Sequence, residues 1–259
     1  MYRMIDAPHH ADANVGWDTV PETVRSTELR IPDYIEITYW WAYVRPWAVR
    51  LLDRTWLVNL YLFSWYRRLV DMTLQEFETL QGSFLQISCC YGDLTLRLYE
   101  RISKDGGSLD VVDILPIQLE NLKHKLPFGV PVGLYHMDAA GLTFSDASYD
   151  NVLLFFLLHE EPQEYRVKTL REALRVLKPS GRIILVDYGV PHRSHPVRLL
   201  MPLLNWLEPT ARELRRQPLT NVLPNEMANH SWRTLSLFGG LYQIIIGTSK
   251  DRSVYIGSV

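Results

Sequence analysis

Short apolar runs alternate with amphipathic runs between residues 84 and 188, and this pattern constrains the fold more than any other feature. The run at 150–157 is apolar throughout after Asn151, which is typical of a strand buried on both faces. Such an alternation predicts a parallel sheet with helical crossovers. We expect strands at 84–88, 109–113, 132–136, 150–157 and 182–187, and helices at 94–102, 116–126 and 163–177.

The segments before this region have a different composition. Residues 1–30 are polar and mixed, which predicts a flexible tail. Residues 31–80 predict a helical cap that breaks near Pro46, and residues 81–259 predict the α/β domain itself.

The end of the chain adds two further elements to that domain. A mostly helical insertion is predicted at about 196–238. Two β-like runs follow, at 241–247 and 252–256, and a close pair of strands at the end of an α/β sheet predicts an antiparallel edge. The expected fold class is therefore α/β, with a mostly parallel sheet and an antiparallel C-terminal edge.

Charge and cysteine usage exclude several classes of protein. Net charge is 27 − 29 = −2, so the chain is no general binder of polyanions, and no nucleic-acid module is recognisable. The two cysteines, Cys89 and Cys90, are adjacent, which excludes a disulfide framework and fits a reducing compartment.

Targeting features point to the cytoplasm. The first 29 residues hold five acids and two arginines, the opposite balance to a signal or transit peptide. The longest strongly apolar uncharged stretch, 55–66, has twelve residues, whereas a spanning helix needs about 20. We expect a cytoplasmic protein that is soluble or lies on a membrane.

The first strand-to-helix turn, 86–95, reads QISCCYGDLT and contains one glycine, Gly92. Nucleotide-binding turns usually carry several glycines, and Ser88 and Cys90 stand where others are expected. A plain strand–turn–helix is therefore one interpretation. The other is a nucleotide site, because Asp113 ends the second strand 21 residues after Gly92, where an acid can bind ribose hydroxyls. For Asp113 alone, a helix N-cap is the alternative.

Three further stretches resemble class I S-adenosylmethionine (SAM) dependent methyltransferases, which have a Rossmann-like fold. They are 138–150, 157–159 and 171–187, and they are most similar to the quinone-modifying branch. The resemblance implies that Asp138 reaches the adenine amino group and that Ala139 lines the ring. The implied SAM-binding set is Ser88, Cys90, Tyr91, Gly92, Asp113, Ile114, Asp138 and Ala139.

A narrower resemblance, to the rhodoquinone biosynthesis proteins, rests on other stretches. These are 31–43 (IPDYIEITYWWAY), 56–60 (WLVNL), 91–95 (YGDLT), 108–113 (SLDVVD) and 116–119 (PIQL). That family replaces a ring methoxy group of ubiquinone with an amino group taken from SAM, and it uses manganese. The resemblance therefore implies amino transfer to ubiquinone with Mn²⁺, in anaerobic respiration.

The first turn gives a physical reason to expect something other than plain methyl transfer. A Cβ at Cys90 pushes on the methionyl end of SAM, and we hypothesise that this turns the amine toward the quinone. Two alternatives stay open: an ordinary SAM-dependent methyltransferase acting on a quinone or phenolic lipid, and a non-catalytic binding protein of this fold.

The predicted metal ligands follow the fourth and fifth strands. His159, Glu160 and Glu161 come after the fourth strand, at the carboxyl edge where ligands bind, and Asp187 ends the fifth. Manganese prefers carboxylate, water and some imidazole, and can polarise a quinone carbonyl. His159, Glu160 and Asp187 are the metal candidates, and His159 and Glu160 are also catalytic candidates. The alternative is that the acids only begin a helix favourably.

Aromatic residues are concentrated in the predicted cap. Between residues 34 and 66 there are five Trp, five Tyr and one Phe. Tyr39 and Tyr43 share one helical face, and both are candidates for the catalytic site. Rings suit a planar quinone and also a membrane interface, although packing on the sheet is the alternative.

Charge also predicts a lipid surface. From Arg166 to Arg216 there are eleven basic and four acidic residues, and the run 197–207 is mostly apolar. This combination is typical of proteins that lie on anionic bilayers, here the bacterial inner membrane that holds ubiquinone. The alternative is a solvated helix face beside a core helix.

Overall fold

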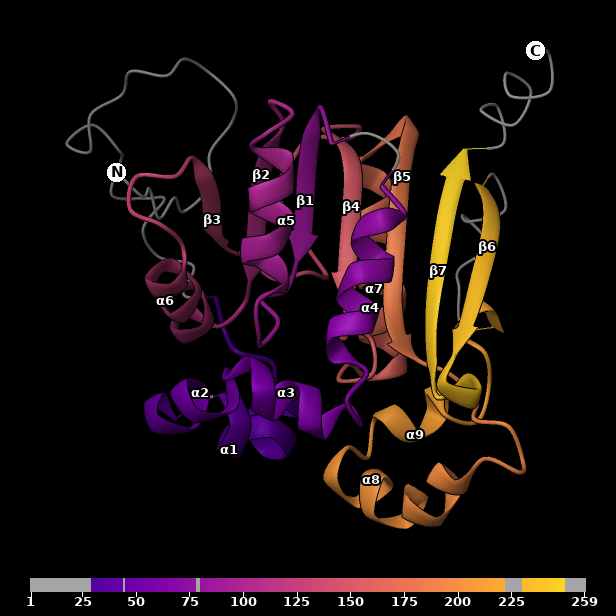
Figure 1. The fold of residues 1–259 in the computed structure, drawn as a ribbon. Coiled ribbons are helices and arrows are strands. Elements are labelled where there is room, and N and C mark those ends of the chain that lie inside the picture. Colours follow the sequence, from indigo (N-terminus) through magenta and orange to yellow (C-terminus); the bar gives the residue numbers. More distant parts are fainter. Residues whose placement is uncertain (1–28, 44, 78–79, 222–229, 250–259) are drawn as a thin grey trace.

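The computed structural model describes residues 29–43, 45–77, 80–221 and 230–249. A seven-stranded sheet crosses the molecule in the order β3-β2-β1-β4-β5-β7-β6 (Figure 1). The strands are β1 Ser83–Ile87, β2 Ser108–Asp113, β3 Val132–His136, β4 Tyr149–Phe155, β5 Leu177–Tyr188, β6 His230–Leu237 and β7 Tyr242–Ser249. The first five strands are parallel, and β7 runs antiparallel to both β5 and β6. The predicted parallel sheet with an antiparallel edge is confirmed.

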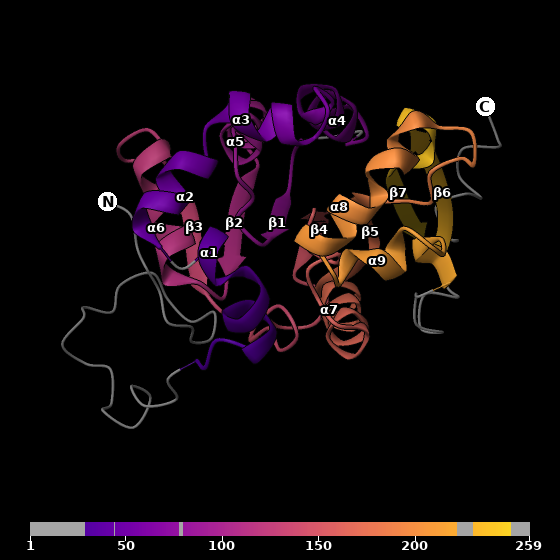
Figure 2. The same cartoon turned by 90° about the horizontal axis from the view of Figure 1, so that it is seen from below.

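Helices cover both faces of this sheet. Figure 2 shows α4 Tyr66–Gln75 and α5 Leu94–Ile102 on one face and α7 Gln163–Val176 on the other. Helix α6 Pro116–Lys125 follows β2, with Pro116 at its start. The helices predicted at 94–102, 116–126 and 163–177 are confirmed to within a residue at each end.

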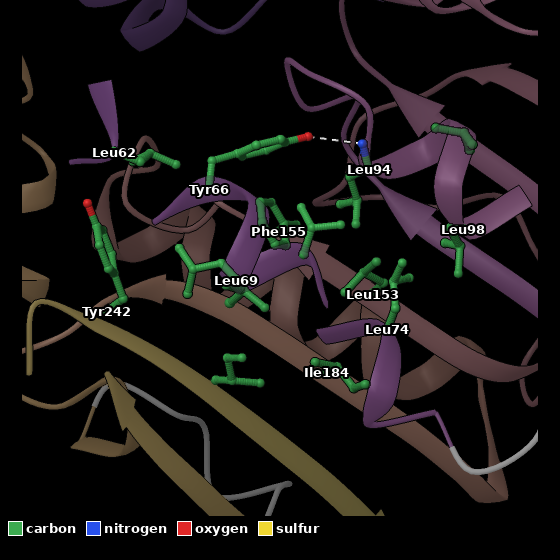
Figure 3. Packing of buried hydrophobic residues seen from close by; sticks show 14 of the residues in the cluster. Leu62, Tyr66, Leu69, Leu74, Leu94, Leu98, Leu153, Phe155, Ile184 and Tyr242 are labelled. Atoms are coloured by element: carbon green, nitrogen blue, oxygen red, sulfur yellow. Dashed lines mark hydrogen bonds between the residues drawn. The ribbon is translucent and has the colours of Figure 1, made fainter. Parts of the chain in front are cut away.

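Helix α4 packs on the sheet through residues spaced at three to four positions. Tyr66, Leu69, Val70 and Leu74 are buried in one core with Phe155 and Ile184 of the sheet. Figure 3 shows Tyr66, Leu69 and Leu74 beside these sheet residues. The Tyr66 hydroxyl reaches beyond this core and accepts the Leu94 N–H at 3.0 Å, at the start of α5. Helix α4 thereby joins the core to the first strand-to-helix turn.

The predicted cap consists of several short pieces below the carboxyl edge of the parallel strands (Figure 1). They are η3 Ile35–Tyr39, α1 Trp40–Tyr43, α2 Pro46–Leu52 and α3 Thr55–Tyr61. The break expected near Pro46 is present, and Phe63 and Ser64, with positive φ, separate α3 from α4. No residue of α3 is buried. Among the described residues, no helix combines the length and apolar character needed to cross a bilayer.

The insertion before the last strands is shorter than predicted. Its helical pieces are η4 Pro196–Leu200, α8 Met201–Leu207, α9 Ala211–Leu214 and η5 Leu219–Asn221. The prediction of helix up to residue 238 is wrong, because β6 occupies 230–237 as the outer strand of the antiparallel edge. An exposed edge strand with few apolar residues carries a weak period-two signal. The strand predicted at 252–256 and residues 1–28 of the predicted tail lie outside the described residues.

Candidate active site

A cavity of about 260 Å³ opens at the carboxyl edge of the parallel strands. Its sheet side is formed by the turns after β1, β2, β3 and β4, and its helical side by η3, α1, α3 and the end of α8. Most predicted site residues line it, namely Tyr39, Tyr43, Ser88, Cys90, Tyr91, Asp113, Ile114, Asp138, Ala139, His159 and Glu160. Gly92 and Asp187 lie just behind the wall.

The turn after β1 adopts a glycine-like backbone without the expected glycines. Ser88 has φ +75°, in the left-handed region that side chains disfavour. The Gln86 side chain donates to the Ser88 carbonyl at 2.9 Å and so holds the bend. Cys90 lines the cavity, and burial raises the pKa of its thiol to about 12. A neutral thiol therefore faces the ligand space at neutral pH.

Gly92 is required by its surroundings. Its φ is +93°, and a Cβ at this position would lie 2.3 Å from the hydroxyl oxygen of buried Tyr66. The Gly92 N–H donates to Asp53 at 2.9 Å, and Lys125 bridges Asp53 and the Gly92 carbonyl. These contacts tie the cap to the first turn.

Asp113 connects the first and second turns. Its carboxylate accepts the Cys89 N–H at 2.7 Å and the Leu115 N–H at 2.8 Å, and the Ser88 hydroxyl lies 3.4 Å away. Burial raises the pKa of Asp113 to about 6, although these hydrogen bonds lower it. Asp113 is therefore largely ionised at pH 7 and faces the cavity.

The turn after β3 completes the sheet side. Asp138 accepts the Ala140 N–H at 2.8 Å and lines the cavity beside Ala139. Ile114, whose carbonyl contacts the His136 ring nitrogen at 3.0 Å, lies on the same side. Asp113 and Asp138 thus reach one cavity from neighbouring turns.

His159 follows β4 and faces three carboxylates. Its Nδ1 lies 3.2 Å from Asp187 Oδ1, and its Nε2 lies 3.9 Å from Glu160 Oε1 and 3.8 Å from Glu208 Oε1. Burial lowers the pKa of His159, but the carboxylates of Asp187, Glu208 and Glu160 together outweigh burial, and the pKa rises to about 9. Asp187 also accepts the backbone N–H groups of His159 and Tyr188. These bonds fix its carboxylate beside the imidazole, on the side away from the cavity.

Glu160 and Glu161 differ in their partners. Tyr43 donates its hydroxyl hydrogen to Glu160, and burial raises the pKa of Glu160 to about 7. Glu161 accepts the Thr169 hydroxyl at 2.7 Å, and burial raises its pKa to about 8. Both acids line the cavity, so neither merely begins a helix.

The sequence did not reveal Glu208, which the structure brings opposite His159. It accepts the Tyr61 hydroxyl at 2.6 Å and pairs with buried Arg215, whose guanidinium lies 4.4 Å from the Tyr188 ring centroid. The pair is hidden in the sequence, because Arg215 and Arg166 stand among basic residues that predict a charged surface. Both arginines are buried, and Arg166 binds Glu213. The sequence offers only an acid, Glu208, followed seven residues later by a base, Arg215, as a signal for this pair.

The aromatic side chains that predict substrate contact form a row. The Tyr39 and Tyr43 ring centroids lie 5.9 Å apart, and those of Tyr43 and Tyr91 lie 5.4 Å apart. Tyr91 donates to the Ala42 carbonyl at 2.7 Å and accepts from Gln118 at 3.0 Å. Rings in this row can pack against a planar substrate.

The predicted metal ligands are not arranged as a preformed metal site in the part of the chain that the structure describes. Within the residues described, no three His, Cys, Asp or Glu side chains are arranged to hold a metal ion. His159, Glu160 and Glu208 do face one cavity, and imidazole with carboxylates is a donor set that suits manganese.

Comparison with known proteins identifies what this chain is similar to. Residues 84–181 match the family model of a methyltransferase domain. A demethylmenaquinone methyltransferase of Thermus thermophilus is 32% identical over 131 residues, 50% of this chain and 56% of that protein. The ubiquinone/menaquinone biosynthesis C-methyltransferase UbiE of Rickettsia prowazekii is 27% identical over 149 residues, 54% of this chain and 58% of that protein.

Comparison with solved structures supports a Rossmann-like methyltransferase fold. An O-methyltransferase family protein from Burkholderia thailandensis superposes with a TM-score of 0.57 at 15% identity, covering 74% of this chain and 58% of that one. The chain spans less than two thirds of each of these relatives. The matched residues 84–181 run from β1 into β5 and include the turns that carry Ser88, Asp113 and Asp138.

Proposed function

We propose that this chain, which has the class I SAM-dependent methyltransferase fold, transfers the amino group of SAM to ubiquinone. The amino group replaces a ring methoxy group, and the product is rhodoquinone. The observation that carries the proposal is the first turn, where Ser88 and Cys90 bring side chains to the wall on which such folds usually use glycine. The resemblance at 31–43 and 91–95 supports it further.

SAM would bind the sheet side of the cavity. Asp113 would accept hydrogen bonds from the ribose hydroxyls, and Asp138 would reach the adenine amino group beside Ala139 and Ile114. The methionyl end would lie against Ser88, Cys90 and Tyr91. Cys90 would then turn the amine, rather than the sulfonium methyl, toward the quinone.

The helical side would hold the quinone ring and accept a proton. The SAM ammonium must lose a proton before its nitrogen attacks the ring carbon that carries the methoxy group. Glu161, which lines the cavity, has a pKa of about 8 and is not among the proposed manganese ligands, suits this role as a base. A carbon–nitrogen bond then forms and methoxide leaves. For transfer to be complete, the quinone ring would take the two electrons of the α C–H bond and become a quinol, which leaves an imine between nitrogen and the SAM α-carbon. Water would hydrolyse this imine, so that the 2-oxo acid derived from SAM leaves and the nitrogen stays on the ring, and oxidation of the quinol gives rhodoquinone.

Manganese belongs to the same proposal. His159 and Glu160 would hold the ion, with Glu208 facing them, and Asp187 would orient His159 from behind. The ion, when bound, would supply Lewis acidity to a quinone carbonyl. Manganese binding can be measured on the protein alone by electron paramagnetic resonance, and His159→Ala with Glu160→Gln should abolish it.

The substrate also determines the cellular location we propose. Ubiquinone carries an isoprenoid tail and resides in the bilayer, so the enzyme must meet lipid. The proposal therefore includes peripheral attachment to the cytoplasmic face of the bacterial inner membrane.

The deciding experiment uses SAM labelled with nitrogen-15 at the amine. Purified protein is incubated with ubiquinone, manganese and labelled SAM, and the quinones are examined by mass spectrometry. Label in a rhodoquinone product supports amino transfer, whereas product without the label contradicts it. Asp113→Ala should lose SAM binding and product together, which provides the control.

Quinone methyl transfer is the second candidate, favoured by the similarity to the two quinone methyltransferases. Its products are S-adenosylhomocysteine and a methylated quinone without the nitrogen label. Cys90→Gly separates the two candidates. In an amino transferase this variant should lose amino transfer and gain methyl transfer, and full amino transfer with no methyl transfer would contradict the role given to Cys90.

A further inference from the structure

Exposed large apolar side chains are concentrated in two short segments. Among the described residues, fourteen such side chains are exposed, and eleven of them lie in 35–61 and 196–207. They are Ile37, Trp41, Trp47, Leu51, Trp56, Leu60 and Tyr61 in the first segment, and Leu199, Leu200, Leu203 and Trp206 in the second. We call these eleven residues the apolar rim. Water-facing helices of a soluble monomer rarely carry such a set.

The two segments lie at the same end of the molecule. Figures 1 and 2 show α1–α3 and α8 together below the carboxyl edge of the sheet. Two hydrogen bonds join the first segment to residues directly after the second, from Tyr61 to Glu208 at 2.6 Å and between the Tyr39 and Thr210 hydroxyls at 2.5 Å. The apolar rim is therefore one surface made from distant parts of the chain.

The cavity opens within this surface. Trp41 and Tyr61 both line the cavity, yet they are 41% and 43% exposed, so they mark its mouth. Leu57 and Leu207, from the two segments, line the cavity just inside. Trp56 at 60%, Leu199 at 85% and Trp206 at 76% exposure lie outside that lining.

The charges around the rim are mainly basic. Exposed arginines flank both segments, at Arg45, Arg50, Arg54, Arg193, Arg198, Arg212 and Arg216. Among the acids of 35–61 and 193–216, three have basic partners: Asp53 pairs with Lys125, Glu208 with Arg215 and Glu213 with Arg166. Glu36 is the exposed exception. Tryptophan beside arginine matches the interface of an anionic bilayer.

We propose that the apolar rim inserts into the headgroup region of the leaflet that it faces in an anionic membrane, with both segments contributing, and that the isoprenoid tail of the substrate enters between α3 and α8. The choice of substrate rests on the proposed function; the lipid surface does not. A lipid bilayer fits this surface better than a protein partner, because a protein that covered the rim would close the mouth through which a substrate must pass.

The test measures binding of the full chain to vesicles, without SAM or quinone. Vesicles contain phosphatidylcholine alone or with phosphatidylglycerol, and bound protein is separated by flotation. The variants are Trp56→Ser, Trp206→Ser and the double variant. The matched control is Phe128→Ser, because Phe128 is 94% exposed in the connection that leads into β3, at the opposite edge of the sheet.

We expect binding to require phosphatidylglycerol and to weaken in high salt. Each tryptophan variant should weaken binding about tenfold and the double variant more, whereas Phe128→Ser should bind normally. Equal binding by the parent and the double variant, with unchanged melting temperatures, would overturn the proposal. If only one of the two single variants lost vesicle binding, the claim that both segments insert would be wrong. A dimer in solution that the tryptophan variants convert to monomer would assign the rim to a second copy instead.

Activity assays separate this inference from the proposed function. The double variant should keep the parent rate on a short-tailed, water-soluble ubiquinone and lose it on long-tailed ubiquinone in vesicles. Equal rates for parent and variant on both substrates would contradict the entry route. If neither the parent nor the double variant makes rhodoquinone, but vesicle binding follows the expected pattern, then the proposed function is wrong and the proposal that the apolar rim binds lipid is kept.

Discussion

The sheet side and the helical side of the cavity differ in what holds their side chains. On the sheet side, Asp113 accepts backbone N–H groups from the first and second turns, and Asp138 accepts one from its own turn. On the helical side, tyrosine hydroxyls bond to side chains, as in Tyr43–Glu160, Tyr61–Glu208 and Tyr39–Thr210. Backbone contacts move only when the fold moves, whereas side-chain contacts rearrange with rotamers.

This difference suits the two ligands that we propose. SAM is the same small molecule in every turnover. Side chains that are held by backbone hydrogen bonds place its atoms in the same way each time. A quinone with a long tail must enter and leave, and α3, with no buried residue, can shift at small cost in buried apolar area. Variants that disturb one side should therefore behave differently from variants that disturb the other.

The largest expected effect is on the helical side, at Arg215. Arg215→Leu leaves the buried Glu208 carboxylate without its guanidinium, and we expect the free energy of unfolding to fall by about 3–5 kcal/mol. Urea denaturation measures this change. Arg216→Leu is the matched control, because Arg216 is exposed and should change stability by less than about 0.5 kcal/mol. Equal stabilities of the two variants would mean that the pair does not fix the helical side.

The next effect is on the sheet side, at Gly92. Gly92→Ala combines a left-handed backbone with a Cβ that meets the buried Tyr66 hydroxyl, so we expect a loss of about 3 kcal/mol. Gly106→Ala is the control for backbone strain alone, since φ there is +78° and no atom lies within 4 Å of the added Cβ. It should cost about 1 kcal/mol. Similar losses in both variants would exclude the contact with Tyr66 as the cause.

The pKa of a buried carboxylate should depend on whether backbone N–H groups or side chains donate hydrogen bonds to it. Burial raises the pKa of Glu161 to about 8, whereas Asp113, which accepts two backbone N–H groups, rises only to about 6. The folded protein therefore keeps a proton on Glu161 that the unfolded chain releases above pH 4.5. Stability should fall as pH rises from about 5 to 8.

Thermal melts across this pH range measure the effect. Glu161→Gln should flatten the decline by about 3 kcal/mol, because glutamine does not ionise. Glu164→Gln is the control, since Glu164 is exposed and its pKa is lowered by Lys168. A decline that stays equally steep in Glu161→Gln would show that other groups bind the protons.

The sequence predicted the sheet side in more detail than the helical side, for a physical reason. Strand ends and the turns after them follow from local patterns, so Asp113 and His159 can be assigned to one edge from the sequence, and the resemblance to methyltransferases adds Asp138. Glu208 cannot be assigned in this way, because its position depends on how α8 folds back toward His159, about 50 residues earlier in the chain. Short helices with few buried residues give weak periodic signals.

The edge strand and the buried arginines show the same limit. Strand β6 has few apolar residues, and only its pairing with β7 makes it a strand. Arg166 stands on a face of α7 that looks polar in sequence, yet it is fully buried because Leu158, Thr210 and Glu213 meet it there. Partners distant in sequence decide the burial of a charge, and a single sequence does not identify them.

The smallest expected effect is at Ser88, on the sheet side. There the cost of a left-handed backbone opposes the gain from the contact between the serine hydroxyl and Asp113. Ser88→Gly removes the cost of a left-handed serine and also a weak 3.4 Å contact with Asp113. Ser88→Ala removes the contact and keeps the cost. We expect the glycine variant to be more stable than the alanine variant by about 1 kcal/mol in urea denaturation. The reverse order would mean that the hydroxyl contact, rather than the backbone, holds this turn, and the sheet side would then resemble the helical side.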